Sequence, residues 1–333
     1  METGEEDSFI TSLTPTFILG AKGNKSSYAL MYSATSDTFH SSHKDNNTDQ
    51  HATADAAFEF NVRNRLKLNA GFHQIEETAS KDQTVENDKY STLNAGGVFS
   101  YGAETARAQI DFGANVQKLQ YDNTGTLNAD KDRETTAFNA VGYLRVAPKT
   151  RLLLELRHTD YSYDTNTVLD SQNVGVMGGV SWEATAKTTG TVKVGGESKQ
   201  FDNHAISDKS SAMWEAGVTW EPLMYSTLSL NTRSGLDEGA AGASVIKSRS
   251  STLNWRHAWL ERLSTDLNYT HTTQDYQNIV RDDTIDAAGL GLTYAMRRWL
   301  DVGAGYKYAE TDSTFAGESD KRNIFSLSVN ASL

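Results

Sequence analysis

The feature that most constrains the fold is the stretch Asn173–Asp202, which reads NVGVMGGVSWEATAKTTGTVKVGGESKQFD. Both of its limbs alternate between apolar and polar or small residues with period two, and a polar turn, Ala184–Lys187, separates them. Such alternation predicts strands with one apolar and one polar face. Each limb runs for about ten to thirteen residues, whereas soluble strands have about five to six. At roughly 3.3 Å per residue, a limb of this length can cross a membrane on a tilted path.

The same unit recurs along the whole chain, as pairs of limbs joined by short turns and separated by longer polar loops. We count 17 limbs: Phe9–Leu19, Ser26–Phe39, Ala52–Arg63, Arg65–Glu77, Lys89–Tyr101, Ala106–Tyr121, Arg133–Val146, Arg151–Tyr163, the two limbs of Asn173–Asp202, Ser210–Glu221, Ser226–Ser234, Ser248–Trp259, Leu263–Tyr276, Asp283–Ala295, Leu300–Glu310 and Asn323–Leu333. Pro148 and Pro222 fall in the short turns, where a missing N–H breaks no ladder. The recurrence predicts an all-β chain.

Composition narrows the class of protein further. Only 38% of the residues are hydrophobic, and no apolar run reaches the roughly 18 residues that a membrane helix requires, which still permits half-apolar barrel strands. With no cysteine, the chain has no disulfide, no thiol nucleophile and no Cys-ligated metal. A net charge of −12 without a basic stripe argues against nucleic acid as a partner. We expect no cofactor.

Aromatic residues recur at or beside the short turns, about 40 residues apart as in some repeat proteins. They are Tyr101, Tyr143, Trp182, Trp220, Trp259 and Trp299. Each repeat holds two long limbs and not the four strands of a propeller blade. Aromatic rings at one height of every hairpin are typical of an interfacial girdle, because amphipathic rings settle at the lipid headgroups. We therefore predict a periplasmic aromatic girdle, the alternative being strand-end tryptophans of a soluble barrel.

These patterns together predict a transmembrane antiparallel up-and-down β-barrel that occupies residues 1–333 as a single domain. Barrels of this class normally have an even number of strands with both ends in the periplasm. With 17 limbs, the first one starts outside the cell. We therefore expect residues 1–8 to be the remnant of an extracellular loop, and the complete protein to carry an upstream strand, the eighteenth, and a signal peptide.

In a membrane barrel the polar face lines the lumen. Our lumen-lining candidates are Arg107, Asp111, Arg151, Glu155, Arg157, Lys193, Glu197 and Lys199. Their signs are mixed, so we expect cross-strand pairing and no strong ion selectivity. The cluster Arg151, Glu155 and Arg157 is either a structural charge ladder, the more common case, or a binding site.

Catalytic and metal sites have little support. His158, Asp160 and Ser162 alternate along one strand, and alternate residues of a single strand do not build a triad. The segment His40–His51 contains three histidines and several oxygen ligands, but it lacks the glycine and distal glutamate of a calcium loop. We interpret it as a solvated polar loop. All the loops are short, so we expect none to fold inward as a plug or constriction.

Two segments near the N-terminus resemble a known family. The run Glu6–Phe17, EDSFITSLTPTF, followed by Ser27–Tyr32, SYALMY, resembles the β-barrel porins encoded with exopolysaccharide and capsule biosynthesis genes. In that family a strand precedes such a segment, as the odd limb count also suggests. The resemblance implies an outer-membrane barrel that conducts, or assists the export of, a secreted polysaccharide, and it supplies no catalytic residues.

The sequence therefore predicts a porin-like barrel of the bacterial outer membrane that is not an enzyme. Two alternatives stay open: a general small-solute diffusion porin, and a non-conducting structural or adhesive surface barrel. The expected partners are outer-membrane lipid, the outer-membrane barrel assembly machinery, a polysaccharide and a periplasmic export partner. The assembly machinery reads a final alternating limb such as the one that ends at Leu333.

Overall fold

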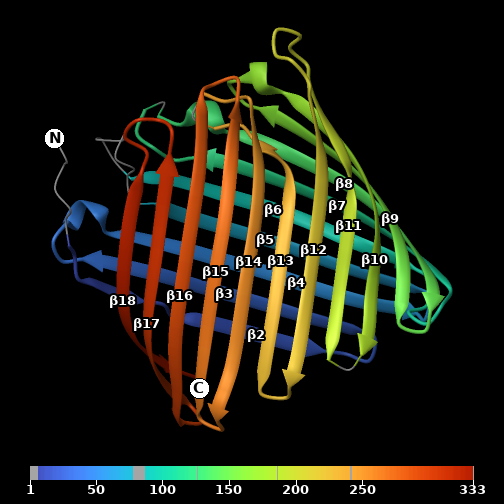
Figure 1. Cartoon of the computed structure of the whole chain (residues 1–333), viewed down its shortest axis with the longest axis horizontal. Helices are drawn as coiled ribbons and strands as arrows, with labels where there is room; N and C mark the ends of the chain where they lie inside the picture. The colour runs from blue at the N-terminus through green and yellow to red at the C-terminus, as the bar shows by residue number, and fades with distance from the viewer. Residues whose placement is uncertain (1–6, 78–86, 126, 186, 241, 333) are drawn as a thin grey trace. The chain divides into compact units, whose positions relative to one another are not determined.

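The computed structural model describes residues 7–77, 87–125, 127–185, 187–240 and 242–332, which are almost entirely β-strand (Figure 1). The first strands are β1 (Ile10–Leu13), β2 (Thr16–Lys22), β3 (Ser26–Phe39), β4 (Asn47–Asn61), β5 (Asn64–Glu77), β6 (Asp88–Tyr101), β7 (Ala108–Tyr121), β8 (Arg133–Ala147) and β9 (Thr150–Tyr163). The remaining strands are β10 (Ser171–Thr185), β11 (Thr188–Phe201), β12 (Lys209–Leu223), β13 (Ser226–Glu238), β14 (Val245–Leu260), β15 (Leu263–Gln277), β16 (Arg281–Arg297), β17 (Leu300–Ser313) and β18 (Asp320–Ala331).

Helical structure in the described residues is limited to three 3-10 turns: η1 (His43–Asp45), η2 (Ala129–Lys131) and η3 (Thr167–Leu169). None of the described helices has the length and apolar character needed to cross a membrane. The strands follow the predicted limbs closely, and most bounds differ by one to three residues. Long alternating limbs are therefore a reliable guide to the strands of this chain.

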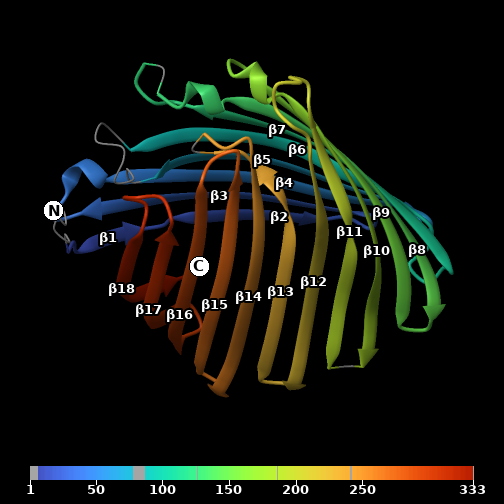
Figure 2. The same ribbon diagram turned by 45° about the horizontal axis from the view of Figure 1, so that its top comes forward.

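The chain forms two compact units, which we describe separately. The first comprises residues 1–142, 156–174 and 200–207, and the second residues 143–155, 175–199 and 208–333. In the first unit each strand from β3 to β7 pairs antiparallel with the strand before it. In the second unit the same holds from β12 through β18 (Figure 2). Up-and-down connectivity is thus confirmed.

Strands β1 and β2 are two parts of one pass. Both pair with β3, β1 at Ile10↔Phe39 to Leu13↔Ser36 and β2 at Thr16↔Ser33 to Lys22↔Ser27. The break falls at Pro15, which has no N–H for the ladder, although its carbonyl still accepts from Ala34 N–H at 3.2 Å. The 18 strands among the described residues therefore trace the 17 passes that the sequence predicts.

A repeated backbone hydrogen bond links successive short-turn hairpins. In the second unit, Ala258 N–H donates to the carbonyl of Tyr225 at 2.8 Å, and Ala295 N–H donates to the carbonyl of Arg262 at 2.8 Å. The donors stand where the register shifts by one residue just before each turn. Such bulges leave one residue out of the ladder and raise the local twist of the strand. The short turns of this unit therefore share one end of the strands.

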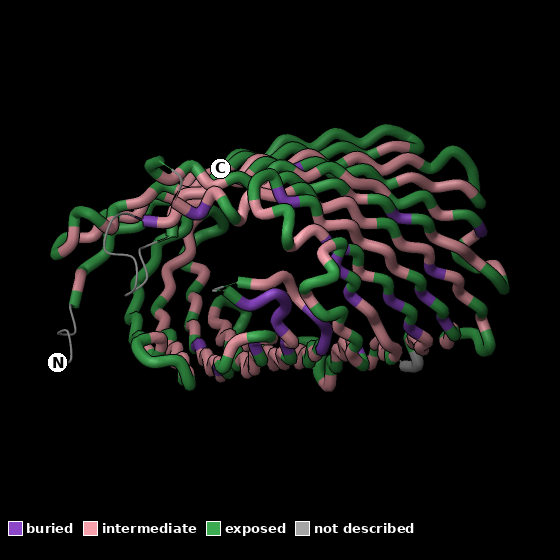
Figure 3. The backbone as a smooth tube through the Cα atoms, turned by 90° about the horizontal axis from the view of Figure 1, so that it is seen from above, coloured by how far each residue is buried: buried purple, intermediate pink, exposed green. Residues whose placement is uncertain are grey.

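One face of each unit is apolar and exposed. In the second unit an apolar row crosses four strands in register: Leu267 lies opposite Leu290, Leu290 opposite Tyr306, and Tyr306 opposite Phe325. Leu290 is 50% exposed and Phe325 is 82% exposed. Exposed and half-buried segments alternate along the strands (Figure 3). An exposed apolar face on a chain with a polar opposite face is the membrane-barrel arrangement.

The prediction of a polar loop over His40–His51 is wrong in its second half. After η1, strand β4 begins at Asn47, which lies opposite Asp37 of β3. Backbone pairing tolerates polar side chains, so the strand continues past the apolar band into water. The second unit shows the same transition on its apolar face, where His271 lies opposite Asp286. Sequence alternation detects the membrane-embedded part of a strand and misses its polar extension.

Candidate functional site

A row of alternating charge crosses the polar face of the second unit. Lys193 of β11 lies opposite Glu215 of β12, and Glu215 lies opposite Arg233 of β13. Arg233 also donates to Asp237, with Nη2 2.7 Å from Oδ1. Cross-strand neighbours of opposite sign stabilise a sheet. The mixed signs of this row pair with one another and with neighbouring residues.

Lys193 bridges two carboxylates across the strands. Its Nζ lies 2.9 Å from Glu155 Oε2 on β9 and 2.5 Å from Glu215 Oε2 on β12. To reach Glu155 the side chain passes over Gly179 of β10, where an added Cβ would lie 2.9 Å from Lys193 Cγ. The side chain of Glu155 is only 6% exposed, and that of Lys193 is 16% exposed. A pair this buried is costly to break, because each partner loses an opposite charge in a site that water reaches poorly.

Two adjoining hollows line the polar face beside this bridge, with volumes of about 610 and 430 Å³. They share Thr191, Gly217 and Asn231. The larger hollow lies toward the short turns and is lined also by Arg145, Pro148, Lys149, Arg151, Ser181, Trp182, Glu183, Thr189, Gly190 and Thr219. The smaller one continues it along Lys193, Glu215, Ala216, Thr232, Arg233, Ser250 and Thr252. We call the two hollows together the polar groove.

The chemistry of the polar groove is that of neutral hydrogen bonding. Threonine and serine hydroxyls and the Asn231 amide offer donors and acceptors in both senses. Gly217 leaves the backbone open between them, since an added Cβ there would meet the Asn231 side-chain oxygen at 3.0 Å. The charges of the smaller hollow are compensated by ion pairs. Where the two hollows meet, the groove is therefore suited to a polar, hydroxyl-rich molecule.

Beyond Ser234 the hairpin of β13 and β14 separates from β12 and reaches polar-face side chains of β11, while β14 stays paired with β15 as far as Val245. Strand β12 pairs with β11 as far as Lys209, but its register with β13 ends at Trp214↔Ser234. Beyond Ser234 the hairpin continues to Glu238↔Val245 and contacts β11 instead. Residues 234–236 and 243–246 are buried and are among the purple stretches of Figure 3. Short loops conceal this feature because the departing segment is itself a regular hairpin.

Most of the predicted lumen candidates lie on the polar face of the second unit. Arg151 lines the larger hollow, Glu155 and Lys193 form the bridge, and Glu197 and Lys199 hold the departing hairpin. In the first unit, Asp111 lies opposite Ser100 and accepts from Gln109 at 2.9 Å, whereas Arg107 precedes β7 and stands in the turn. Arg157 is in β9 of the first unit. The structure thus brings five of the eight candidates into one wall.

The sequence does not single out Arg233 of the polar groove or two acidic residues of nearby ion pairs. The predicted limb Ser226–Ser234 ends before β13 does, and so it omits Asp237, the partner of Arg233, and Glu238, the partner of Lys199. Asn231, Arg233, Gly235 and Asp237 share one parity, which was a usable signal. The serine and threonine residues of the polar groove give no such signal in the sequence, because these residue types are common on both faces of strands.

The predicted girdle residues do not all share one face. Tyr101 is 51% exposed and lies opposite Ile110 on the apolar face, and Trp220 and Trp259 are 46% and 56% exposed. The Trp182 ring lies over Gly190, whose added Cβ would meet it at 2.5 Å, and Trp299 is in the turn before β17. Tyr143 departs from the pattern. It has the parity of Asn139, whose amide lies against Gly113 on the polar face, while its neighbour Leu144 is 43% exposed.

The histidines form local pairs. His40 Nε2 lies 3.0 Å from Thr11 Oγ1, and His51 Nδ1 lies 2.8 Å from His73 Nδ1. His158 pairs with Asp160 at 2.9 Å along one strand. Within the described ranges no group of three or more His, Cys, Asp or Glu side chains is placed to hold a metal ion.

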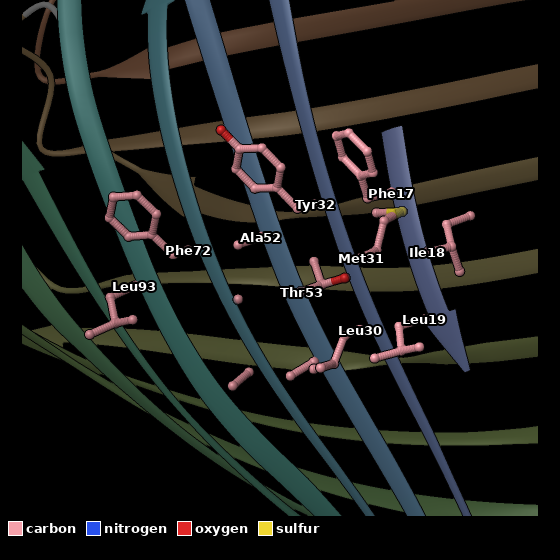
Figure 4. Close-up of a pocket in the computed structure, with 13 residues that line it drawn as sticks. Phe17, Ile18, Leu19, Leu30, Met31, Tyr32, Ala52, Thr53, Phe72 and Leu93 are labelled. Carbon is pink, nitrogen blue, oxygen red and sulfur yellow. The ribbon is translucent and has the colours of Figure 1, made fainter. Parts of the chain in front are cut away.

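A third hollow, of about 520 Å³, is apolar and lies on strands β2 to β6 of the first unit (Figure 4). The small residues Ala52, Ala54 and Ala70 line it together with larger ones: Phe17, Ile18, Leu19, Leu30, Met31, Tyr32, Phe72 and Leu93. Polar groups contribute little to it, which separates it from the polar groove. Exposed apolar surface of this kind is covered by lipid tails in a membrane barrel.

Comparison with solved structures places the fold among outer-membrane transporters. The FrpB iron transporter from Neisseria meningitidis in its F3-3 variant has a TM-score of 0.55 at 12% identity, covering 95% of this chain and 64% of that one. The F5-1 variant gives 0.54 at 11% identity, with 94% and 64% covered. The copper transporter OprC gives 0.52 at 11% identity, with 96% and 64% covered. The chain thus spans less than two thirds of the length of these structures. At such identities the likeness concerns the fold alone.

No curated protein matches the sequence. A family match is nevertheless complete: the family described as Putative beta-barrel porin 2 covers residues 1–333. This family and the barrel structures above are porins and transporters of the bacterial outer membrane, not enzymes. The chain belongs to the Putative beta-barrel porin 2 family, and its place is the bacterial outer membrane.

Proposed function

We propose that residues 1–333 act as a single barrel domain that conducts a hydroxyl-rich polymer, an exopolysaccharide, out across the outer membrane. The observation that carries this proposal is the polar groove, whose two hollows adjoin at Thr191, Gly217 and Asn231. Each hollow is within the roughly 300–1,000 Å³ of typical ligand sites. A chain of sugars needs such consecutive polar subsites, whereas a single small solute needs one.

Charge compensation supports a neutral substrate. Lys193 is shared between Glu155 and Glu215, and Arg233 is paired with Asp237. A pore that selects ions requires rings of one sign or desolvated unpaired charges. Weak pairwise hydrogen bonds along the groove would let a polymer bind and advance, because conduction requires binding that is also easily released. A periplasmic export partner would meet the short-turn end, where the larger hollow lies.

Planar bilayer recording tests this function. Purified protein should give open channels of low ion selectivity that neutral oligosaccharides block from the short-turn side. Replacing Asn231→Leu should weaken that block several-fold, because this amide serves both hollows. The matched control is Asn268→Leu, since Asn268 lies opposite Asn254 on the same face but lines neither hollow.

The outcomes separate the candidates. Channels that conduct salt but ignore oligosaccharides would indicate a general diffusion porin and overturn the export proposal. Folded protein that gives no channels would indicate a structural or adhesive barrel. Equal loss of block in both asparagine variants would show that the polar groove is not the binding surface.

A further inference from the structure

We propose that the β13–β14 hairpin beyond Ser234 is the size-limiting element of the pore, and that Glu197 and Lys199 are specificity-determining residues because they hold it over the polar face. The inference rests on the proposed conducting function. It goes beyond that function by naming which part of the wall sets the limit and which side chains fix its position.

The first tie is a backbone hydrogen bond. Leu236 N–H donates to Glu197 Oε1 at 2.7 Å, although Glu197 is on β11 and lies in register with Ser211 of β12. An added Cβ on Gly235 would come within 3.0 Å of the same oxygen. The hairpin backbone therefore rests directly on the β11 carboxylate, and a glycine at position 235 allows that approach. In an undisturbed sheet, β12 would stand between these two strands.

The second tie is an ion pair between Lys199 Nζ and Glu238 Oε1. The Lys199 side chain is 2% exposed and that of Glu238 is 13% exposed. A lysine is almost never buried to this extent unless it is paired, because an isolated ammonium in a low-dielectric site is very costly. The hairpin position is thus coupled to a buried charge: moving it away would strip Lys199 of this partner.

Three apolar side chains of this region are buried. Met177 of β10 is 1% exposed, Met213 of β12 is 6% exposed, and Leu236 of the hairpin is 8% exposed. Met213 lies opposite Gly195 on the polar face, and its sulfur would meet an added Cβ of Gly175 at 3.3 Å. Burial of apolar side chains on the otherwise polar face of the sheet requires a cover, and we assign that cover to the hairpin. We call these three residues the apolar pad.

The hairpin stands at the end of the polar groove. Arg233 lines the smaller hollow, and the departing segment begins at the next residue, Ser234. A molecule moving along the groove from the short-turn end must therefore pass the hairpin after Arg233. The hairpin keeps its ladder with β15, but its β13 strand meets the polar-face side chains of Glu197 and Lys199, so it occupies space on that face that a substrate would use. Its removal should widen the passage without altering the groove.

Cysteine accessibility tests the position of the hairpin independently of conduction. The chain has no cysteine, so single introduced thiols report cleanly. Met213→Cys should react slowly with a hydrophilic thiol reagent, while Thr189→Cys, exposed on the same face, should react fast. Introducing Lys199→Ala and Glu238→Ala into the Met213→Cys protein should accelerate labelling at position 213 by roughly a hundredfold, because losing the buried ion pair favours local opening of the hairpin. Labelling at position 189 should not change.

Permeation of neutral polyethylene glycols of graded size into proteoliposomes tests the size limit. The Lys199→Ala and Glu238→Ala variant should admit larger polymers than the wild type. A matched control removes the exposed polar-face pair Arg256 and Asp266, with side chains 72% and 49% exposed, and should leave the limit unchanged. In a second variant, Lys199→Cys with Glu238→Cys, a reducible bifunctional thiol cross-linker should restore the small limit and reduction should release it. This arm works even if the alanine variant fails to fold.

Each outcome decides the matter. Equal labelling of position 213 with and without the ion pair would overturn the proposed cover. Faster labelling with an unchanged size limit would show that the hairpin moves but does not limit passage, which also overturns the proposal. A wild type that admits no polymer at all would overturn the conducting function, while the labelling result would still report the hairpin position.

Discussion

Lys193 Nζ lies 2.9 Å from Glu155 Oε2, although β10 separates the strands that carry the two residues. The bridge is possible because position 179 of β10 is a glycine over which the lysine side chain passes. It connects β9 to β12 through one buried cation, since Glu215 is the second partner. A polar face can thus be held together by long side chains as well as by the backbone ladder.

Removing the largely buried cation Lys193 should lower the free energy of unfolding more than removing an exposed cation does. Lys193→Ala removes the cation shared by Glu155 and Glu215 from a largely buried site, and we expect a loss of about 3–5 kcal/mol in the free energy of unfolding. The measurement is urea-induced unfolding of the folded protein in lipid bilayers. Arg256→Ala, which breaks an exposed pair on the same face, should cost less than about 1 kcal/mol. Equal losses in the two variants would contradict the account of the bridge.

Gly179 should be sensitive to a single added methyl group. An added Cβ would lie 2.3 Å from the Val192 carbonyl oxygen and 2.9 Å from Lys193 Cγ, so Gly179→Ala should destabilise by about 1–3 kcal/mol. The control is Gly178→Ala at the preceding residue, because an added Cβ on Gly178 would have no atom within 4 Å. Thermal unfolding followed by circular dichroism compares them. A Gly178→Ala variant as unstable as Gly179→Ala would contradict this account, because the loss of stability would then come from replacing a glycine and not from steric overlap of the added methyl group.

Charge reversal at Arg233 should change ion selectivity. Arg233 lies opposite Glu215 and pairs with Asp237, so Arg233→Glu places three acidic groups beside the smaller hollow. We expect the reversal potential in a salt gradient to shift toward the cation value. Arg249→Glu makes the same charge change on the opposite face, at the position paired with Ser234, and should leave the potential unchanged. A shift of equal size in both would indicate a non-specific charge effect.

Trp220 and Trp259 should report the periplasmic membrane boundary. Both are exposed on the apolar face beside short turns, and aromatic rings prefer the headgroup level. Single-tryptophan variants in bilayers with quenchers at defined depths should place both rings at one shallow depth. Trp255, in register with Leu267 of the apolar row, should be quenched from a deeper position. Equal depths for Trp255 and Trp259 would contradict the proposed girdle.

Strand positions in this chain follow from alternation, because membrane strands expose one face to lipid and the other to water along their whole embedded length. Alternation does not reveal the polar extension of β4 at Asn47, where the apolar face has already ended. Nor does it reveal Tyr143, whose spacing matches the girdle but whose parity puts it on the polar face. Parity is a stronger indicator of face than distance along the chain.

The candidate site was harder to predict than the fold. Glu155, Lys193, Glu197 and Lys199 were identified as polar-face residues from parity, but their partners depend on which strand each side chain reaches. Lys193 crosses one strand, and Glu197 meets a hairpin that has left its place beside β12. No local pattern encodes such a departure, because the hairpin retains regular pairing from Ser226 to Glu238.

The most direct test of the central claim is made in the bacterium that carries this gene. Deleting the gene should abolish surface polysaccharide and cause its accumulation in the periplasm, and expression of the wild type should restore export. Asn231→Leu should restore it poorly, whereas Asn268→Leu should restore it fully. Undiminished surface polysaccharide in the deletion strain would contradict the claim that this barrel is an export conduit.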